Sequence, residues 1–418
     1  MRQRLHQFAL SLITVLIALF SATAPTHAYS VLSHESIIDS MWDDTLLKLL
    51  QRKFPNATPE ELKAAHAFAY GGCIIQDMGY YPFGSRFFTD LTHYVRSGDF
   101  VEAMLQNAQN INEYAFALGS LAHYAADNNG HRIGINHAVP LLYPKLQRKF
   151  GNEVAYEDDP GAHLKTEFGI DVLQVARGRY VSDRYRQFIG FEVSKPLLER
   201  AFLDTYGLKL DDVFGNVDLA IGSYRRGVSS IIPKMTRVAW ELKKDDIEKT
   251  IPGITREKFL FNLSRASFEQ EWGKNYKEPG FGTKVIAFLV RWVPKVGPFR
   301  VLQFRTPTPE VEKLYLESVN ATLASYRQLL AAEAAGRRDL TNQNLDLGKS
   351  IQYGSYKMAD ETYEKLLEKL SKQKSASVPA DLQANIRGFY KASQPKSIVR
   401  LLDKLKLTAS NGAAKHNR

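Results

Sequence analysis

The chain has 418 residues, of which 44% are hydrophobic and 24% are charged, and these fractions exclude a disordered, collagen-like or multi-span membrane protein. Its 55 lysines and arginines against 45 acidic residues give a formal net charge of +10, which suits anionic partners such as nucleic acid, acidic lipid or phosphorylated small molecules. Cys73 is the single cysteine, so the sequence excludes an intrachain disulfide and a cysteine-based zinc finger. Any metal must therefore be held by histidine, aspartate, glutamate or backbone groups.

Residues 1–28 predict a secretory signal peptide. Two arginines precede an apolar run, Phe8–Phe20, that is too short for a bilayer span, and the small residues Thr26 and Ala28 form a cleavage site. The alternative is an uncleaved anchor. Cleavage after Ala28 would make Tyr29 the new N-terminus, and we therefore expect a secreted or periplasmic protein.

The rest of the chain has mostly helical patterns. Thr58 is a predicted N-cap, with Glu61 at the capping-box position, and Gly130 is expected to end a helix. Patterns typical of strands are scarce, so we predict an all-α fold with a multi-helix domain at residues 29–235 and an additional helical region at 236–418. Helical periodicity covers residues 36–54, 59–70, 99–108, 111–127, 211–226, 256–270, 309–335 and 360–372.

Histidines are concentrated in the first part of the chain after residue 28, where seven of eight lie between His34 and His163. His123 and Asp127 are four residues apart, so on a helix both leave from one face. His163 and Glu167 have the same spacing. Two such pairs in one window, together with His34, Asp77, His93 and His131, predict a zinc centre without cysteine.

The other candidates near this cluster are less specific. Asp77 lies among aromatic residues, where a buried carboxylate is costly unless it is paired or bound to metal; the alternative is a loop aspartate that caps a turn. His66 is interpreted as a packing residue, and His137 as a residue that supports the ligands from behind. His34 lies five residues after Tyr29, whose free amine and carbonyl could chelate the same ion.

Two aromatic segments have alternative interpretations. We expect most of the aromatic side chains between residues 80 and 88 to be core, with a lipid or headgroup pocket as the alternative. Residues 284–304 combine apolar, aromatic and basic side chains with two prolines. A buried helix–turn–helix is the favoured interpretation there, and a membrane-interface segment is the alternative. The aromatic residues of the first segment are Tyr80, Tyr81, Phe83, Phe87 and Phe88.

Together the motifs resemble the zinc-dependent phospholipase C family, in particular the phospholipase C/D domain also found in glycosylphosphatidylinositol-specific phospholipase D. The matching pieces, in order, are Y-S-V-L-S-H, D-M-G-Y-Y-P, F-x-D-x-x-H, H-Y-A-A-D-x-x-x-H and A-H-x-x-x-E-F-G-x-D-V, over about residues 29–175. A more distant likeness is to S1/P1-type nucleases. The family's bacterial enzymes usually begin with tryptophan where this chain has Tyr29.

The resemblance implies an all-helical domain that holds up to three zinc ions. Asp77, His93, His123 and Asp127 would hold one ion, and His131, His163 and Glu167 a second. The amine and carbonyl of Tyr29, with His34 and a shared Asp127, would hold a third. Asp77 could also orient or deprotonate the attacking water.

The implied activity is hydrolysis of the headgroup phosphodiester of a phospholipid by a metal-activated water, with C-type cleavage favoured over D-type cleavage. The substrate is then a phospholipid, with peripheral membrane contact, and nucleic acid is a less favoured partner. The alternatives are an S1/P1-like nuclease or other phosphoesterase, and a non-catalytic zinc-stabilised binding protein. The headgroup, the oligomeric state and the role of residues 236–418 stay open.

Overall fold

The described part of the chain is mostly helical. These residues contain fourteen α-helices and no β-strand, which confirms the predicted all-α fold class. The predicted signal peptide, Tyr29, the predicted helix 256–270 and residues 284–300 lie outside the described part of the chain. The computed structural model describes residues 30–177, 189–232, 301–338, 340–372, 378–393 and 398–403, with isolated positions beside these ranges.

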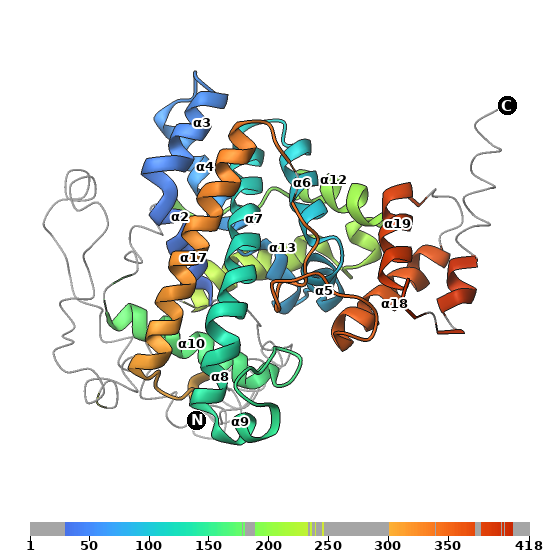
Figure 1. Ribbon diagram of the computed structural model, residues 1–418. Coiled ribbons are helices and arrows are strands. Elements are labelled where there is room, and N and C mark those ends of the chain that lie inside the picture. The colour runs from blue at the N-terminus through green and yellow to red at the C-terminus, as the bar shows by residue number, and fades with distance from the viewer. Residues whose placement is uncertain are drawn as a thin grey trace, which may run out of the picture.

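The helices surround one long central helix, α7, as Figure 1 shows. Short 3₁₀ or π-helical turns connect several of them, at Trp42–Leu46, Ile75–Tyr80, Gly130–Ile135, Leu210–Asp212 and Gly227–Ile231. The helices are α2 Val31–Met41, α3 Leu47–Lys53, α4 Pro59–Gly72, α5 Arg86–Tyr94, α6 Ser97–Asn107, α7 Ile111–Asn129, α8 Asn136–Leu142, α9 Pro144–Phe150, α10 Pro160–Ala176, α12 Lys195–Tyr206, α13 Val217–Arg226, α17 Pro309–Ala334, α18 Lys357–Lys372 and α19 Ala380–Phe389.

The predicted helices are found with changes at their ends. Thr58 caps α4 as predicted, because its side chain accepts the backbone N–H of Glu61 while the Glu61 carboxylate accepts the backbone N–H of Thr58. Residues 36–54 are interrupted by a π-helical turn between α2 and α3. Residues 211–226 form the end of a 3₁₀ turn and then α13, which Asn216 caps.

Helix α7 is buried along nearly its whole length, as expected for a helix that carries small and apolar side chains on every face. The long helix α17 runs antiparallel beside it (Figure 1). Two tyrosine hydroxyls join the pair, since Tyr326 donates to the carbonyl of Leu118 over 2.8 Å and Tyr114 donates to Glu333 Oε1 over 3.1 Å. The metal-binding candidates on α7 therefore sit on a rigid element.

Helix α4 approaches α7 so closely that glycines are required at the crossing. A Cβ on Gly119 would lie 2.2 Å from the carbonyl oxygen of Ala69, and a Cβ on Gly72 would lie 2.0 Å from that of Phe116. We expect Gly119→Ala to lower the free energy of unfolding by at least about 2 kcal/mol, because the helices must separate. Gly222→Ala on α13 is the matched control, since nothing lies within 4 Å of its added Cβ. Equal urea unfolding midpoints for the two variants would contradict the close contact between α4 and α7 at Gly119.

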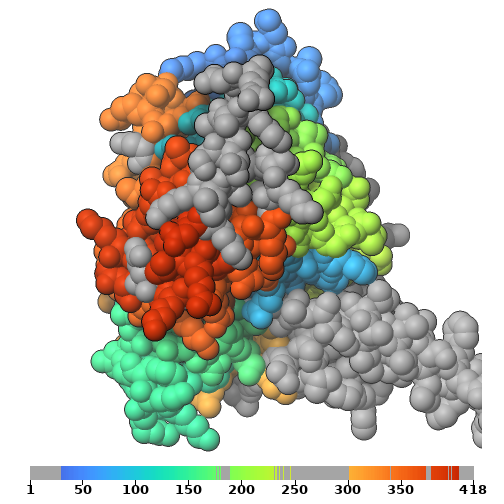
Figure 2. All heavy atoms as spheres, turned by 90° about the vertical axis from the view of Figure 1, so that its right-hand side faces the viewer, coloured from blue at the N-terminus to red at the C-terminus, as the bar shows by residue number. Residues whose placement is uncertain are grey.

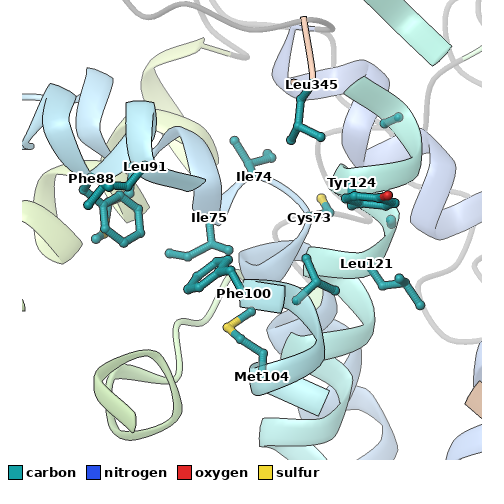
Figure 3. Packing of buried hydrophobic residues seen from close by; sticks show 14 of the residues in the cluster. Cys73, Ile74, Ile75, Phe88, Leu91, Phe100, Met104, Leu121, Tyr124 and Leu345 are labelled. Atoms are coloured by element: carbon teal, nitrogen blue, oxygen red, sulfur yellow. The ribbon is translucent and has the colours of Figure 1, made fainter. Parts of the chain in front are cut away.

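The hydrophobic core continues from α7 beneath α5 and α6. Figure 3 shows Cys73 and Ile74 packed in this core, with Leu121 from α7 nearby and Leu345 from the C-terminal region above Ile74. Helices α18 and α19 cover one face of the molecule (Figure 2) and add their apolar residues to the same core. The C-terminal region is thus packed against the metal-binding half of the chain, although the predicted domain boundary at residue 235 stays a prediction.

The aromatic residues 80–88 are mostly core, as predicted. Tyr80, Tyr81, Phe87 and Phe88 are buried, whereas Phe83 has 55% of its surface exposed. Of these rings, Tyr81, Phe87 and Phe88 belong to the main hydrophobic core.

The described end of the basic apolar segment is also buried. Val301, Leu302 and Phe304 pack against Phe168 and Val172 of α10 in a small second core. This packing agrees with the burial predicted for this end of the segment, and the helix–turn–helix itself stays a prediction because residues 284–300 lie outside the described part of the chain. Within the described part of the chain, no helix combines the length and the apolar composition that a bilayer span requires.

Candidate metal centre

Four predicted ligands from three elements meet beside α7, and we call them the first metal group. Asp77 lies in the 3₁₀ turn, His93 in the last turn of α5, and His123 and Asp127 one turn apart on α7. His93 Nε2 lies 3.4 Å from Asp77 Oδ1 and 3.1 Å from Asp127 Oδ2, and His123 Nε2 lies 3.1 Å from the same Asp127 oxygen. All four side chains are buried. The structure therefore assembles the four residues expected to hold one ion.

Asp127 also faces a further group through its other oxygen. Its Oδ1 lies 3.5 Å from His34 Nε2, and the rings of His34 and His123 stack with centroids 4.6 Å apart. His34, His123 and Asp127 could together hold an ion. Tyr29, the remaining predicted member of this group, lies outside the described residues.

Asp171 fixes the position of the chain just before His34. Its carboxylate accepts the backbone N–H of Leu32 over 3.0 Å and the hydroxyl of Ser33 over 2.8 Å. The Ser33 hydroxyl is also within 3.1 Å of the Tyr315 hydroxyl of α17. Sequence reasoning gave Asp171 no role; its place in helix α10, four residues after Glu167, was the available signal.

The second metal group is built by α10 and by a π-helical turn after α7. His163 and Glu167 lie one turn apart on α10, with His163 Nδ1 3.8 Å from Glu167 Oε1. As predicted, α7 ends at Gly130, which is its C-cap, but the chain then continues in the π-helical turn Gly130–Ile135. The wider turn changes the direction in which His131 leaves the helix, so it joins His163 and Glu167 instead of the first metal group.

Carbonyl oxygens determine which ring nitrogen of each histidine faces its group. Nδ1 of His123 contacts the Cys73 carbonyl at 3.1 Å, and Nδ1 of His93 contacts that of Thr89 at 2.8 Å. For His163 the atoms are reversed, with Nε2 2.7 Å from the Val154 carbonyl. A carbonyl only accepts, so each contacting nitrogen must carry the proton, and the opposite nitrogen keeps its lone pair for a metal.

The charges in the centre are coupled strongly. Burial would raise the pKa of Asp127, but His123, His93 and His34 hold it well below its usual value. Burial opposes a charge on His93, yet Asp127 and Asp77 outweigh this and raise its pKa to about 9. Burial and the nearby His131 lower the pKa of His163 to about 3, which leaves it in the neutral form that binds metals.

Two other histidines lie outside the metal groups. His66 stacks on Trp42 with ring centroids 3.7 Å apart, and its Nε2 lies 3.3 Å from Asp39. His137 is partly exposed and contacts the Asn152 carbonyl at 3.1 Å. The packing interpretation of His66 is therefore confirmed, and no described contact connects His137 to a predicted ligand.

Asp346 is a site residue that sequence reasoning missed. Its side chain is buried, and its Oδ1 lies 3.3 Å from His131 Nε2. It belongs to the C-terminal region, outside the motifs that carried the resemblance. The one available signal was an aspartate between two leucines, Leu345 and Leu347, where a charge is costly without a partner.

The donor set fits zinc. A tetrahedral ion with bonds of about 2.0–2.1 Å separates its ligand atoms by roughly 3.3 Å, close to the 3.1–3.4 Å spacings in the first metal group. Nδ1 of His163 and Oδ1 of Asp127 are buried without a hydrogen-bond partner, which is unfavourable unless an ion binds them. All predicted ligand side chains offer nitrogen or oxygen atoms, and the thiol of the single cysteine, Cys73, is in none of the groups.

A comparison with protein-family models finds one match to this chain. Residues 33–215 match the model described as zinc dependent phospholipase C. No curated protein and no solved structure gives a significant match. The matched range contains the nine-residue ligand prediction apart from Tyr29, and it ends well before Asp346. Residues 33–215 are therefore similar to the zinc-dependent phospholipase C family, in agreement with the resemblance found in the motifs.

Proposed function

We propose that the protein is a secreted zinc-dependent phospholipase that hydrolyses the headgroup phosphodiester, with C-type cleavage. The family supports a zinc-dependent phosphodiester hydrolase. The observation that carries the proposal is the sharing of Asp127, whose two oxygens face His93 and His123 on one side and His34 on the other. A carboxylate shared in this way would contribute one oxygen to each of two metal groups, and two ions held there would supply charge to one phosphate.

Each metal group has a separate task in this proposal. Bound zinc supplies charge to the phosphate oxygens and lowers the pKa of the attacking water toward roughly 7. Asp127 belongs to both the first metal group and the His34 group, so its carboxylate fixes the distance between them. Asp77, beside His93, would orient the attacking water. His131, His163 and Glu167 would hold an ion that supplies charge to stabilise the leaving oxygen. The carbonyls of Cys73, Thr89 and Val154 keep the histidine rings in the orientation that binds.

Product analysis tests the reaction. The purified protein is incubated with phosphatidylcholine, phosphatidylinositol and single-stranded DNA, with zinc present and after chelation. We expect diacylglycerol and a phosphorylated headgroup, only with zinc. Phosphatidic acid with free headgroup would contradict C-type cleavage, and hydrolysis of DNA without any lipid product would contradict the phospholipase.

The N-terminus gives a further prediction, which depends on the predicted cleavage after Ala28. Asp171 holds residues 32 and 33 in place, and His34 already faces Asp127, so the freed amine of Tyr29 would complete that group. We expect one extra residue before Tyr29 to remove about one zinc per chain and to lower activity at least about tenfold.

The control for this prediction is the same extension placed after Arg418. Zinc content is measured by elemental analysis and activity by release of phosphorylated headgroup. Full zinc content in the N-terminally extended protein would show that the amine is not a ligand.

A further inference from the structure

The chain between α17 and α18 passes along the helices that carry predicted metal ligands. We call residues 340–350 of this segment the strap. In Figure 1 it leaves the upper end of α17, passes α6 and α5, and reaches α18. The backbone N–H of Leu340 donates to Glu102 of α6 over 2.6 Å, and the Tyr124 hydroxyl of α7 donates to the Thr341 carbonyl over 2.7 Å. The strap is therefore attached to α6 and, at the residue next to His123, to α7.

The middle of the strap is held at α6. The Ser97 hydroxyl is 2.7 Å from the Gln343 carbonyl and 3.0 Å from the Gln343 backbone nitrogen, and the backbone N–H of Asp99 donates to Asn342. A Cβ on Gly98 would lie 2.7 Å from the Leu340 carbonyl oxygen, so only glycine permits this approach. These contacts fix the backbone of the strap before it reaches the metal groups.

The strap next contacts the metal groups directly. The backbone N–H of Leu345 donates over 3.1 Å to the carbonyl of His93, a predicted ligand of the first metal group. The Leu345 side chain enters the core beside Ile74 (Figure 3). The next residue, Asp346, is thereby placed at the second metal group, and its own carbonyl accepts a hydrogen bond from Asn136 over 3.0 Å.

The two carboxylate oxygens of Asp346 have different surroundings. Oδ2 accepts the hydroxyls of Tyr94 and Tyr356 over 2.8 and 2.6 Å, which fixes the orientation of the side chain. Oδ1 lies 3.3 Å from His131 Nε2. That spacing is longer than the usual 2.7–3.2 Å of an N–H···O hydrogen bond. It equals the distance of roughly 3.3 Å expected between two ligands of one tetrahedral zinc.

We propose that Asp346 is a fourth side-chain ligand of the second metal group, delivered from the C-terminal region by the strap. His131, His163 and Glu167 supply three donors, and Asp346 Oδ1 supplies the fourth beside His131 Nε2. This rests on the zinc centre of the proposed function and extends it, because the matched family range ends at residue 215. The metal centre of this protein is then incomplete without residues far beyond that range.

Zinc binding without substrate tests the assignment, so its outcome does not depend on which phosphodiester the enzyme cleaves. The full-length mature protein and its Asp346→Asn and Asp346→Ala variants are loaded with zinc and dialysed against a weak chelator, and bound zinc per chain is measured. We expect both variants to lose about one zinc per chain, with at least about a tenfold weaker affinity at that site. Asp360→Asn is the matched control, because its carboxylate contacts the backbone of Gly354 and no ligand.

Cobalt substitution distinguishes a ligand from a residue that only orients His131. Removing a ligand changes the visible absorption of cobalt bound in the second metal group. Removing a residue that only hydrogen-bonds to a ligating histidine weakens cobalt binding and leaves the spectrum unchanged. A changed spectrum in Asp346→Asn, with the helical circular dichroism of the parent protein, is the expected result. An unchanged spectrum, or unchanged zinc content in both variants, would overturn the assignment.

Discussion

Asp127→Asn is expected to lower kcat/KM for phospholipid by at least about 10³-fold. One neutral amide would replace the carboxylate whose two oxygens face the first metal group and His34. Metal ions contribute several kcal/mol to stabilising the transition state, and each 1.36 kcal/mol corresponds to about tenfold in rate. The loss of zinc should accompany the loss of rate, because two metal groups share this residue.

The control for Asp127 is another carboxylate that contacts a histidine. Asp39 lies 3.3 Å from His66 Nε2 and accepts the Tyr70 hydroxyl over 2.5 Å, and it belongs to none of the metal groups. Asp39→Asn is expected to change thermal stability and to leave zinc content unchanged. If Asp127→Asn retains all its zinc while its activity falls, then Asp127 acts on substrate and does not bridge two ions.

His123→Ala is the second change with a large expected effect. His123 takes part in both metal groups that contain Asp127, and its ring stacks on His34. We expect the variant to lose zinc from both groups and to lose at least about 10²-fold in kcat/KM, an effect comparable to removing one positioned electrostatic group from an active site. Zinc analysis and steady-state kinetics on the same preparation test both parts.

The matched histidine is His66. Its imidazole is as deeply buried as that of His123, but it packs on Trp42 and contacts Asp39. His66→Ala should lower the free energy of unfolding through lost packing, by about 2–4 kcal/mol, and keep the zinc content of the parent protein. Equal zinc loss in both variants would mean that the zinc measurement reports general unfolding.

The ligands that lie on helices were the part of the site that the sequence predicted well. Four-residue spacing placed His123 with Asp127 and His163 with Glu167, since α7 and α10 are regular helices at these positions. The direction of His131 could not be predicted, because a π-helical turn has no clear sequence signature and Gly130 suggested a helix end. The resemblance, not the spacing, assigned His131 to the correct group.

Asp346 illustrates what local patterns cannot predict. Its position depends on hydrogen bonds between residues far apart in the sequence, such as the one from Tyr94, 252 residues away. No periodicity or motif connects the strap with α5, and a single sequence contains no record of which distant segments touch. The helical character of the C-terminal region was predictable, but its contribution to the metal centre was not.

The attachment of the strap also has a consequence for how the protein matures. The carbonyl of His93 accepts a hydrogen bond from Leu345. A ligand from the first part of the chain therefore depends on a segment that the ribosome synthesises much later. Contacts between such distant positions form slowly, because a long loop must close first. The finished metal centre therefore becomes available only after most of the chain has emerged and folded, and a chain truncated before the strap would acquire zinc in an unfinished site.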